Sequence, residues 1–391
     1  MKRLRRLGIL ANEFFDERFS RMGGFGWAVS ECIRYFQMRP EMGVEVVLVT
    51  GENDGFHSQL PDKVHGANFI PPSENSLSYR KRLRENQIDL ILSIDYRPNY
   101  RKPLLLLPNT PLIVWARDPR IPNDAERIRE IRLPGEPNRT PQGLETPDCR
   151  SLATLFGLSK ITGRKAIVAA TCDEIGEKAR IAYGMPKERW SNLPNIIELP
   201  TKPSKKAKRP MFLFLGRLDP YKRPWLFVEL ARRLPMFDFV MAGKNHFSGP
   251  GSWQLEGLPD NLRVTGHIQR EEKAQLLNEA WGLINTSVHE GLAVSFLESL
   301  AHETPLVAGV NPESVVSRFG VQVESSSGDG MEGITGYVSA LQELVEDSGM
   351  RTDQGRRGRE WVSETHNAVN FTRSFNALCA QASIELEHAR E

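Results

Sequence analysis

The stretch VTGHIQREEKAQLLNEAWGLINTSVHEGLAVSFLESLAHETPLVAG, residues 264–309, carries the clearest fold signal in the sequence. Short apolar runs alternate in it with longer amphipathic runs. Apolar runs of this length, bounded by glycine, proline or polar residues, predict strands, and the amphipathic runs between them predict helices. The strands are expected at 262–266, 282–287 and 304–309, and the helices at 270–280 and after Gly291. This order is typical of a parallel sheet covered by helices.

The same alternation continues on both sides of this stretch. Before it, strands are expected at 7–11, 44–50, 88–95, 111–116 and 165–170, with helices at 27–37, 76–86 and 172–184. Prolines and lysines with nothing apolar to bury then make up LPTKPSKKAKRP (199–210), which predicts a linker. After the linker the pattern restarts, with strands at 211–216 and 237–243 around a helix at 224–234.

This pattern predicts an α/β fold of two Rossmann-like, doubly wound domains that face each other across a cleft. The first domain is expected at 1–200 and the second at 201–369. A helix at 370–391 is expected to pack back on the first domain, across the junction. Because ligands of such sheets bind beyond the carboxyl ends of the strands, candidate residues are expected in the loops that follow strands.

Length and composition restrict the class of protein. A chain of 391 residues exceeds one ordinary core, and 40% hydrophobic with 26% charged residues is typical of a soluble globular protein. A formal net charge of +2 provides no field that would select nucleic acid as a partner. The four cysteines are scattered, without a CxxC pair, which fits a reducing cytoplasm better than a disulfide framework or a zinc site.

Two further features concern membranes. No apolar run reaches the roughly 18 residues of a membrane span, and acidic residues follow the basic N-terminus too early for a signal peptide. Basic runs at 2–6 and 202–209 suit a solvated terminus and a solvated linker, with weak binding of anionic lipid as the alternative. The chain is therefore expected in the cytoplasm, and peripheral attachment to the inner membrane face stays open.

The loop after the strand at 211–216 carries two cations. Arg217 and Lys222 precede Pro224, which suits the first position of the next helix. Two fixed cations beside a helix N-terminus can bind a diphosphate. The alternative is that both are ordinary surface cations.

The stretch HEGLAVSFLE (289–298) places two glutamates around the start of a helix. An unpaired buried carboxylate is costly, but the two hydroxyls of a ribose would satisfy Glu298, and Glu290 could hold the hydroxyls of a second sugar. Alternatively, Glu298 leans into solvent or pairs with a lysine or arginine. Three amides at this helix start have no intrahelical partner and can hold an anion, those of Leu292, Ala293 and Val294.

A glycine-rich loop, SRMGGFGWAVSE (20–31), runs into the first helix. Gly23, Gly24 and Gly26 would let backbone amides approach a phosphate, and a flexible turn is the alternative, since the run is not GxGxxG. The Walker, HExxH and GxSxG motifs are absent from the sequence. Neither a histidine cluster nor a DxD-type acidic pair indicates a metal site.

Taken in order, these pieces resemble the retaining, nucleotide-sugar-dependent glycosyltransferases of family 4, which have the GT-B fold. GRLDPYKRP (216–224) is similar to the GR…K loop of that family, and residues 264–309 to its long signature with two glutamates spaced E-x7-E. FVMAGKN (239–245) resembles its glycine turn, and MGGFGW (22–27) the glycine loop that faces the donor. The segment 170–199 resembles the end of its first domain, with Asn195 at the asparagine turn.

The resemblance implies a role for each matching position. Arg217 and Lys222 would stabilise the leaving nucleoside diphosphate, Glu298 would bind the ribose, and Glu290 would bind the transferred sugar. The other implied donor contacts are Gly23, Gly24, Gly243, Leu292, Ala293 and Val294, with His267 and Ile268 beside the base. No metal and no cofactor beyond the donor are implied, because the two cations and the helix dipole supply the positive charge. Retention without a clear nucleophile implies front-face attack within an ion pair.

The sequence departs from the family in the first domain. The family often has a histidine that faces the sugar after the strand equivalent to 111–116, where this chain has RDPR. Arg117 or Asp118 could hold a sugar hydroxyl there. The candidate catalytic residues are therefore Glu290, Asp118 and Arg117.

The resemblance implies a retaining, metal-independent glycosyltransferase of hexosyltransferase type, as in polysaccharide biosynthesis. The donor is expected to be a UDP-, GDP- or ADP-sugar, and the acceptor a glycan or glycolipid. The alternative is a non-catalytic GT-B subunit that binds nucleotide sugar or glycan. The sequence identifies neither the base, the sugar nor the acceptor.

Overall fold

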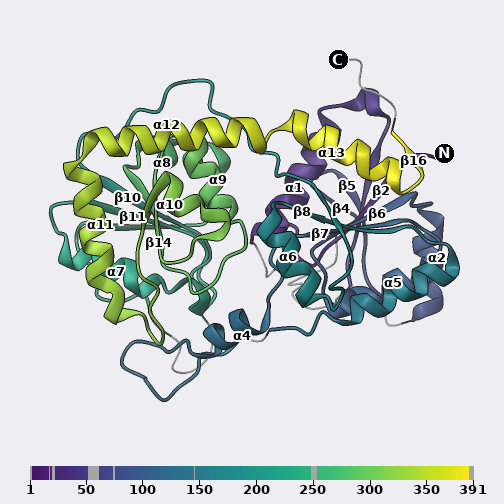
Figure 1. The fold of residues 1–391 in the computed structure, drawn as a ribbon, viewed down its shortest axis with the longest axis horizontal. Helices are drawn as coiled ribbons and strands as arrows, with labels where there is room; N and C mark the ends of the chain where they lie inside the picture. The colour runs from purple at the N-terminus through teal and green to yellow at the C-terminus, as the bar shows by residue number, and fades with distance from the viewer. Residues whose placement is uncertain are drawn as a thin grey trace. The chain divides into compact units, whose positions relative to one another are not determined.

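The computed structural model describes residues 2–16, 18–19, 23–51, 61–73, 75–144, 146–247 and 253–386. The chain divides into two compact units (Figure 1). The first unit holds residues 1–121, 147–196 and 368–391, and the second holds residues 122–146 and 197–367. None of the helices formed by the described residues is long and apolar enough to cross a membrane.

The first unit is built on an eight-stranded sheet in the order β4-β5-β3-β2-β6-β7-β8-β9. Its strands are β2 (Arg6–Leu10), β3 (Glu45–Val49), β4 (Lys63–Val64), β5 (Ala67–Ile70), β6 (Leu90–Ile94), β7 (Leu112–Ala116), β8 (Ala166–Ala170) and β9 (Trp190–Asn192). Neighbouring strands run parallel except β4 and β5, which form a short antiparallel pair. The central strands coincide with the predicted apolar runs, as expected for parallel strands buried on both faces.

Helices cover both faces of this first sheet. On one face, the buried sides of four helices join the apolar core of the unit, α2 (Ser76–Glu85), α3 (Arg101–Leu106), α5 (Ser151–Thr162) and α6 (Asp173–Ala182). On the other face lie α1 (Gly24–Gln37) and α13 (Ala368–Gln381), where Phe371 contacts Tyr35 and Trp115. After α13, β16 (Ile384–Glu385) pairs with β1 (Lys2–Arg3).

The second unit contains a six-stranded sheet in the order β12-β11-β10-β13-β14-β15, with all neighbours parallel. The strands are β10 (Met211–Leu215), β11 (Asp238–Ala242), β12 (Leu262–Gly266), β13 (Gly282–Asn285), β14 (Leu306–Ala308) and β15 (Gly320–Gln322). Alternate residues of a strand point to opposite faces, so Phe212 and Phe214 of β10 join one core layer while Leu213 faces the other.

Helices cover both faces of the second sheet as well. On one face α7 (Pro224–Arg233) contacts α11 (Ile334–Glu346), and both contribute to the core. The other helices are α8 (Arg270–Glu279), α9 (Val294–Ala301), α10 (Val315–Phe319) and α12 (Ser348–Thr365), with α12 packed along α9 (Figure 1). Short 3-10 turns complete the chain, η1 (Pro40–Met42), η2 (Pro98–Tyr100), η3 (Pro220–Lys222), η4 (Pro312–Ser314) and η5 (Met331–Gly333). Both units are doubly wound α/β domains, as predicted.

One segment that the sequence placed in the first domain belongs to the second unit. Residues 122–146, which include α4 (Pro122–Arg129), belong to the second unit although strands of the first unit lie on both sides of them in sequence. Their buried apolar side chains join the second core, namely Ile128, Ile131, Leu133 and Leu144. The segment packs on the core that buries these side chains. Its position between two strands of the first unit does not reveal this.

The lysine-rich stretch predicted as a linker is not fully solvated. Lys206 is half-buried, and its Nζ donates to Thr304 Oγ1 at 2.6 Å and to the carbonyl of His302 at 3.1 Å. Ser204 Oγ donates to the same His302 carbonyl at 2.6 Å. Burial lowers the pKa of Lys206 to about 7, against the opposing effect of Glu303. The stretch therefore packs on the second unit through a polar contact that composition does not reveal.

Replacing Lys206 by methionine is expected to change how the free energy of unfolding depends on pH. Between pH 7 and 10 the unfolded chain holds a proton on Lys206 that the folded chain releases, because the folded pKa is about 7. The free energy of unfolding should therefore rise with pH in wild type, by at most about 1.4 kcal/mol per pH unit from this group. Lys206→Met should lack this rise.

Urea unfolding at pH 7, 8 and 9 measures this effect. Lys205→Met is the matched control, because Lys205 is the exposed neighbour in the same stretch. Equal pH slopes for wild type and Lys206→Met would contradict the prediction.

Candidate active site

Two loops of the second unit meet at the carboxyl edge of its sheet. One follows β10 and contains η3, and the other follows β13, the neighbouring strand. Val288 N donates to the Tyr221 carbonyl at 3.0 Å, and Thr286 Oγ1 donates to the Lys222 carbonyl at 2.5 Å. The strand order and these bonds together bring Lys222 beside Glu290.

Glu290 accepts three hydrogen bonds on one carboxylate oxygen. Its Oε1 accepts from Lys222 Nζ, from Asn285 Nδ2 at 2.9 Å and from Ser287 Oγ at 2.6 Å. Burial alone would raise the pKa of Glu290, but the charge of Lys222 and the three bonds outweigh it and hold the pKa below its usual value. Among the described residues, none donates to Oε2. Glu290 is thus an ionised carboxylate with three donors on one oxygen and no donor from a described residue on the other.

The second predicted cation of this edge is held by an aspartate. Arg217 Nε lies 3.1 Å from Asp219 Oδ2, and Asp219 Oδ1 accepts the Lys222 amide at 3.2 Å. Asp219 is buried and caps η3, whereas the Arg217 side chain is 31% exposed. One aspartate therefore fixes both the guanidinium and the turn that carries the lysine.

The start of α9 offers free backbone donors beside these charges. The amides of Leu292, Ala293 and Val294 donate to no described residue, and no side chain caps the helix. Unpaired amides at a helix start favour anions. The three amides thus have the donors that a phosphate or sugar oxygen needs.

Glu298 forms an ion pair. Its Oε1 lies 2.6 Å from Nζ of Lys273 on α8, and the side chains are 14% and 18% exposed. This is the alternative that the sequence left open, pairing with a lysine. Its Oε2 accepts from none of the described residues. Binding of ribose by Glu298 stays a prediction, and one oxygen is free to take part in it.

Replacing Glu298 by glutamine distinguishes a ribose ligand from a purely structural ion pair. Loss of charged hydrogen bonds to the ribose should weaken UDP binding by about 10- to 100-fold. Lys273→Met is the matched control, since it removes the ion pair but keeps the carboxylate. Isothermal titration with UDP measures both variants. Equal UDP affinity in Glu298→Gln and wild type would show that the pair is structural.

The other predicted donor contacts of the second unit lie at the same edge. His267 is half-buried and Ile268 buried, both directly after β12. Gly243 follows β11, and a Cβ there would lie 1.8 Å from the carbonyl oxygen of Gly216. Close packing of two loops therefore explains Gly243 without a ligand.

In the first unit, the two RDPR residues differ in their surroundings. Arg117 is buried, its Nη2 donates to Asn195 Oδ1 at 2.7 Å, and its guanidinium lies 4.5 Å from the centroid of the Trp115 ring. Burial lowers the pKa of Arg117 to about 10. Asp118 is partly exposed and lies 3.1 Å from Nη2 of Arg120. Arg117 therefore has an interior role, and Asp118 is the better placed of the two to meet a ligand.

Asp95 organises this edge of the first sheet. It follows β6 with φ of 59°, an uncommon value for a residue other than glycine. It is buried, accepts hydrogen bonds from the Tyr183 hydroxyl and from the amides of Tyr96 and Asp118, and burial raises its pKa. Asp95 is not among the residues predicted from the sequence, although an aspartate directly after a buried strand is a signal that could have found it.

The glycine-rich loop is described only in part, since residues 20–22 lie outside the described residues. Gly23 precedes α1 without a capping side chain. Gly24 is exposed, and no atom lies within 4 Å of a Cβ built there. Packing therefore does not explain Gly24, whereas a Cβ on Gly26 would lie 2.5 Å from the Phe15 amide nitrogen.

Other residues that support Glu290 were also missed. Asn285 and Ser287 bond Glu290 directly, and polar residues at the end of a buried strand were an available signal. His289 Nδ1 lies 3.1 Å from Oδ1 of Asp124 on α4, and both are buried. No sequence signal joins Asp124 to His289, because the pair depends on the packing of α4 in the second unit.

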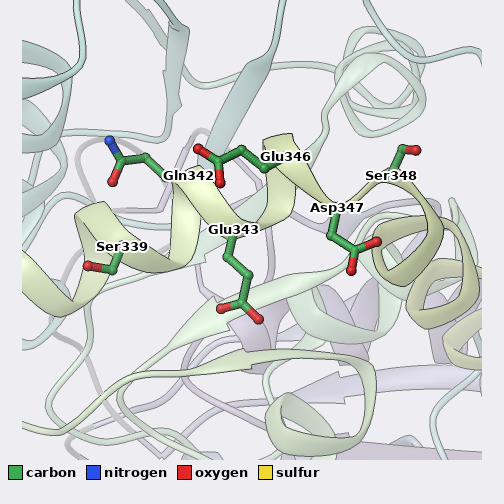
Figure 2. A pocket seen from close by; sticks show the side chains of 6 residues that line it. All are labelled: Ser339, Gln342, Glu343, Glu346, Asp347 and Ser348. Atoms are coloured by element: carbon green, nitrogen blue, oxygen red, sulfur yellow. The ribbon is translucent and has the colours of Figure 1, made fainter.

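A surface hollow lies elsewhere in the second unit and is unsuited to a diphosphate. Figure 2 shows it at the end of α11 and the start of α12, lined by Ser339, Gln342, Glu343, Glu346, Asp347 and Ser348. It contains three carboxylates and no cation, and Asp347 already caps α12. No group of three or more His, Cys, Asp or Glu that could hold a metal ion occurs within the described ranges.

Part of the chain, including the residues of this edge, matches a known protein family. Residues 195–361 match the family described as glycosyl transferases group 1. The matched segment includes Arg217, Lys222, Glu290 and Glu298, the four charged residues that the resemblance implied. No curated protein sequence matches the chain.

Solved structures extend the likeness to almost the whole chain. Sucrose-phosphate synthase (tll1590) from Thermosynechococcus elongatus matches with a TM-score of 0.69 at 16% identity, over 96% of this chain and 99% of that one. Anabaena Alr3699/HepE in complex with UDP-glucose matches with 0.66 at 13%, over 96% and 99%. The pneumococcal O-GlcNAc transferase GtfA in complex with UDP and GlcNAc matches with 0.66 at 9%, over 97% and 99%. The predicted GT-B fold is thereby confirmed.

Proposed function

We propose that this chain transfers a hexose from a nucleoside-diphosphate sugar to a glycan or glycolipid, with retention at the anomeric carbon and without a metal ion. The observation that carries the proposal is the contact between Lys222 and Glu290. It places a fixed cation and an ionised carboxylate at the carboxyl edge of the sheet in the second unit.

The charges of this edge suit a departing diphosphate. Cleavage of the bond to the sugar leaves negative charge on the diphosphate, and preorganised cations and amides stabilise such charge. Lys222 and Arg217 are held in place by Glu290 and Asp219, and the amides of α9 are unpaired among the described residues. Together they supply the positive charge that a metal ion provides in other transferases.

The carboxylates are assigned to the two sugars of the donor. The free oxygen of Glu290 would accept a hydroxyl of the transferred hexose, and that of Glu298 would accept a ribose hydroxyl. The ionised Glu290 also favours the positive charge that develops on the sugar ring as the bond breaks. The chain offers no assigned nucleophile, so the acceptor would attack from the face that the diphosphate leaves, within an ion pair.

A UDP-sugar is the first donor to test. HepE is seen with UDP-glucose and GtfA with UDP and GlcNAc, and both have this fold. Low identity leaves GDP- and ADP-sugars as further candidates, and a cytoplasmic location would give access to all three donors.

A donor panel tests the proposal. Purified protein with UDP-, GDP- and ADP-sugars should hydrolyse one donor slowly and transfer it faster when glycan or lipid extract is added. The rate should persist in EDTA, and NMR of the product should show the anomeric configuration of the donor. Tight binding of a donor without hydrolysis or transfer would instead support a non-catalytic subunit that binds nucleotide sugar.

A further inference from the structure

Three neighbouring helices of the first unit carry an excess of positive charge. The helices α2, α3 and α5 contain seven lysines and arginines and one glutamate. The whole chain, in contrast, has 51 basic and 49 acidic residues. The charge of these helices is therefore a local property, which a net charge of +2 conceals.

The same three helices expose large apolar side chains. Eight large hydrophobic residues are exposed among the described residues, and four of them lie on these helices, Leu77 at 78%, Leu105 at 47%, Leu158 at 43% and Ile161 at 83%. A single exposed leucine needs no explanation. Four of the eight exposed hydrophobic residues lie on three short helices that also carry cations, and this concentration does need an explanation.

The three helices form one continuous surface. α2 contacts α3, and Nζ of Lys102 on α3 donates to the carbonyl of Ser73, just before α2, at 2.6 Å. Thr162 Oγ1, at the end of α5, lies 3.4 Å from the carbonyl oxygen of Pro108, just after α3. All three pack against the same core, so their other sides face outward from the same layer of the first unit.

We propose that this basic-apolar surface, formed by α2, α3 and α5, binds an anionic lipid bilayer. Cations would attract the phosphate headgroups, and the exposed leucines and isoleucine would enter the boundary between headgroups and acyl chains. The combination favours lipid over nucleic acid, because the exposed members are aliphatic and none of the three helices exposes an aromatic ring on which a base could stack. The inference is independent of the proposed glycosyl transfer.

Vesicle flotation tests the proposal with the full chain. The protein should float with vesicles of phosphatidylglycerol and phosphatidylcholine and stay at the bottom with phosphatidylcholine alone. Binding should fall as salt is raised, since the attraction is screened. Absence of binding to anionic vesicles would overturn the proposal, and equal binding to both kinds of vesicle would overturn the role of charge.

Two double variants test whether vesicles bind to this basic-apolar surface. Arg84→Gln with Lys160→Gln removes two exposed cations, and should weaken binding to anionic vesicles roughly 10- to 30-fold. Leu77→Ser with Ile161→Ser removes the two most exposed apolar side chains of the surface and should weaken binding as well. Circular dichroism and hydrolysis of a donor should match wild type, since none of these residues belongs to the candidate active site.

Two control variants alter similar side chains elsewhere. Lys202→Gln with Lys205→Gln removes two exposed cations of the basic run at 202–209. Met236→Ser removes an apolar side chain that is 56% exposed. Both should bind vesicles as wild type does. If the linker variant loses binding and the surface variant keeps it, the proposed location is wrong. If both surface variants bind anionic vesicles as wild type does, this surface does not bind lipid and the proposal is wrong.

Discussion

Replacing Lys222 by alanine is expected to lower the rate of sugar transfer about 10²- to 10³-fold, the effect typical of removing one preorganised charge from a transition state. Lys222 Nζ contacts Glu290, and its backbone is fixed by Asp219 and Thr286. The ammonium group would face the departing diphosphate. Its loss removes stabilising charge and leaves the buried carboxylate of Glu290 with only Asn285 and Ser287 as donors.

The effect of Lys222→Ala should fall mainly on kcat. Steady-state kinetics with the accepted donor measures it, and thermal unfolding shows whether the fold persists. Lys205→Ala is the matched control, an exposed lysine of the same unit that should keep the wild-type rate. A wild-type kcat in Lys222→Ala would remove the diphosphate assignment from this edge.

The fold could be predicted because its signals are local. Apolar runs at β2, β3, β6, β7 and β8, and the alternation at 264–309, each specify an element within a short window. Because ligands bind beyond the carboxyl ends of parallel strands, candidate residues were expected in the loops that follow strands, and Lys222 and Glu290 lie in two such loops. The structure brings both together through the pairing of β10 with β13.

The rest depends on contacts between residues far apart in sequence. Lys273 pairs with Glu298 across two helices, Asp124 reaches His289 because α4 packs on the second unit, and Asn195 holds Arg117 in the interior. Lys206 is half-buried although its stretch has the composition of a linker. In each case a charged side chain contacts a partner that is distant in sequence. The hydrophobic periodicity of the sequence does not predict such contacts, because they form only when the elements pack together.

Replacing Glu290 by glutamine is expected to lower kcat by about 10²-fold or more while the affinity for UDP stays near the wild-type value. Glutamine keeps the size of the side chain and an oxygen that can accept from Lys222, Asn285 and Ser287. It removes the negative charge that would stabilise the developing positive charge of the sugar. Glu298→Gln should show the opposite division, with weaker UDP binding and a smaller effect on kcat.

The pH dependence of the rate tests the same carboxylate. The pKa of Glu290 is held below its usual value by Lys222, so the ionised form should persist through the ordinary carboxyl range and the rate should fall only as pH drops below it. Without Lys222, burial is opposed only by the two neutral donors, and the pKa of Glu290 should rise. The acid limb of the pH–rate profile should therefore move to higher pH in Lys222→Ala and disappear in Glu290→Gln. An acid limb that stays at one pH in all three proteins would belong to another group, and Glu290 would then hold the sugar without its charge contributing to the rate.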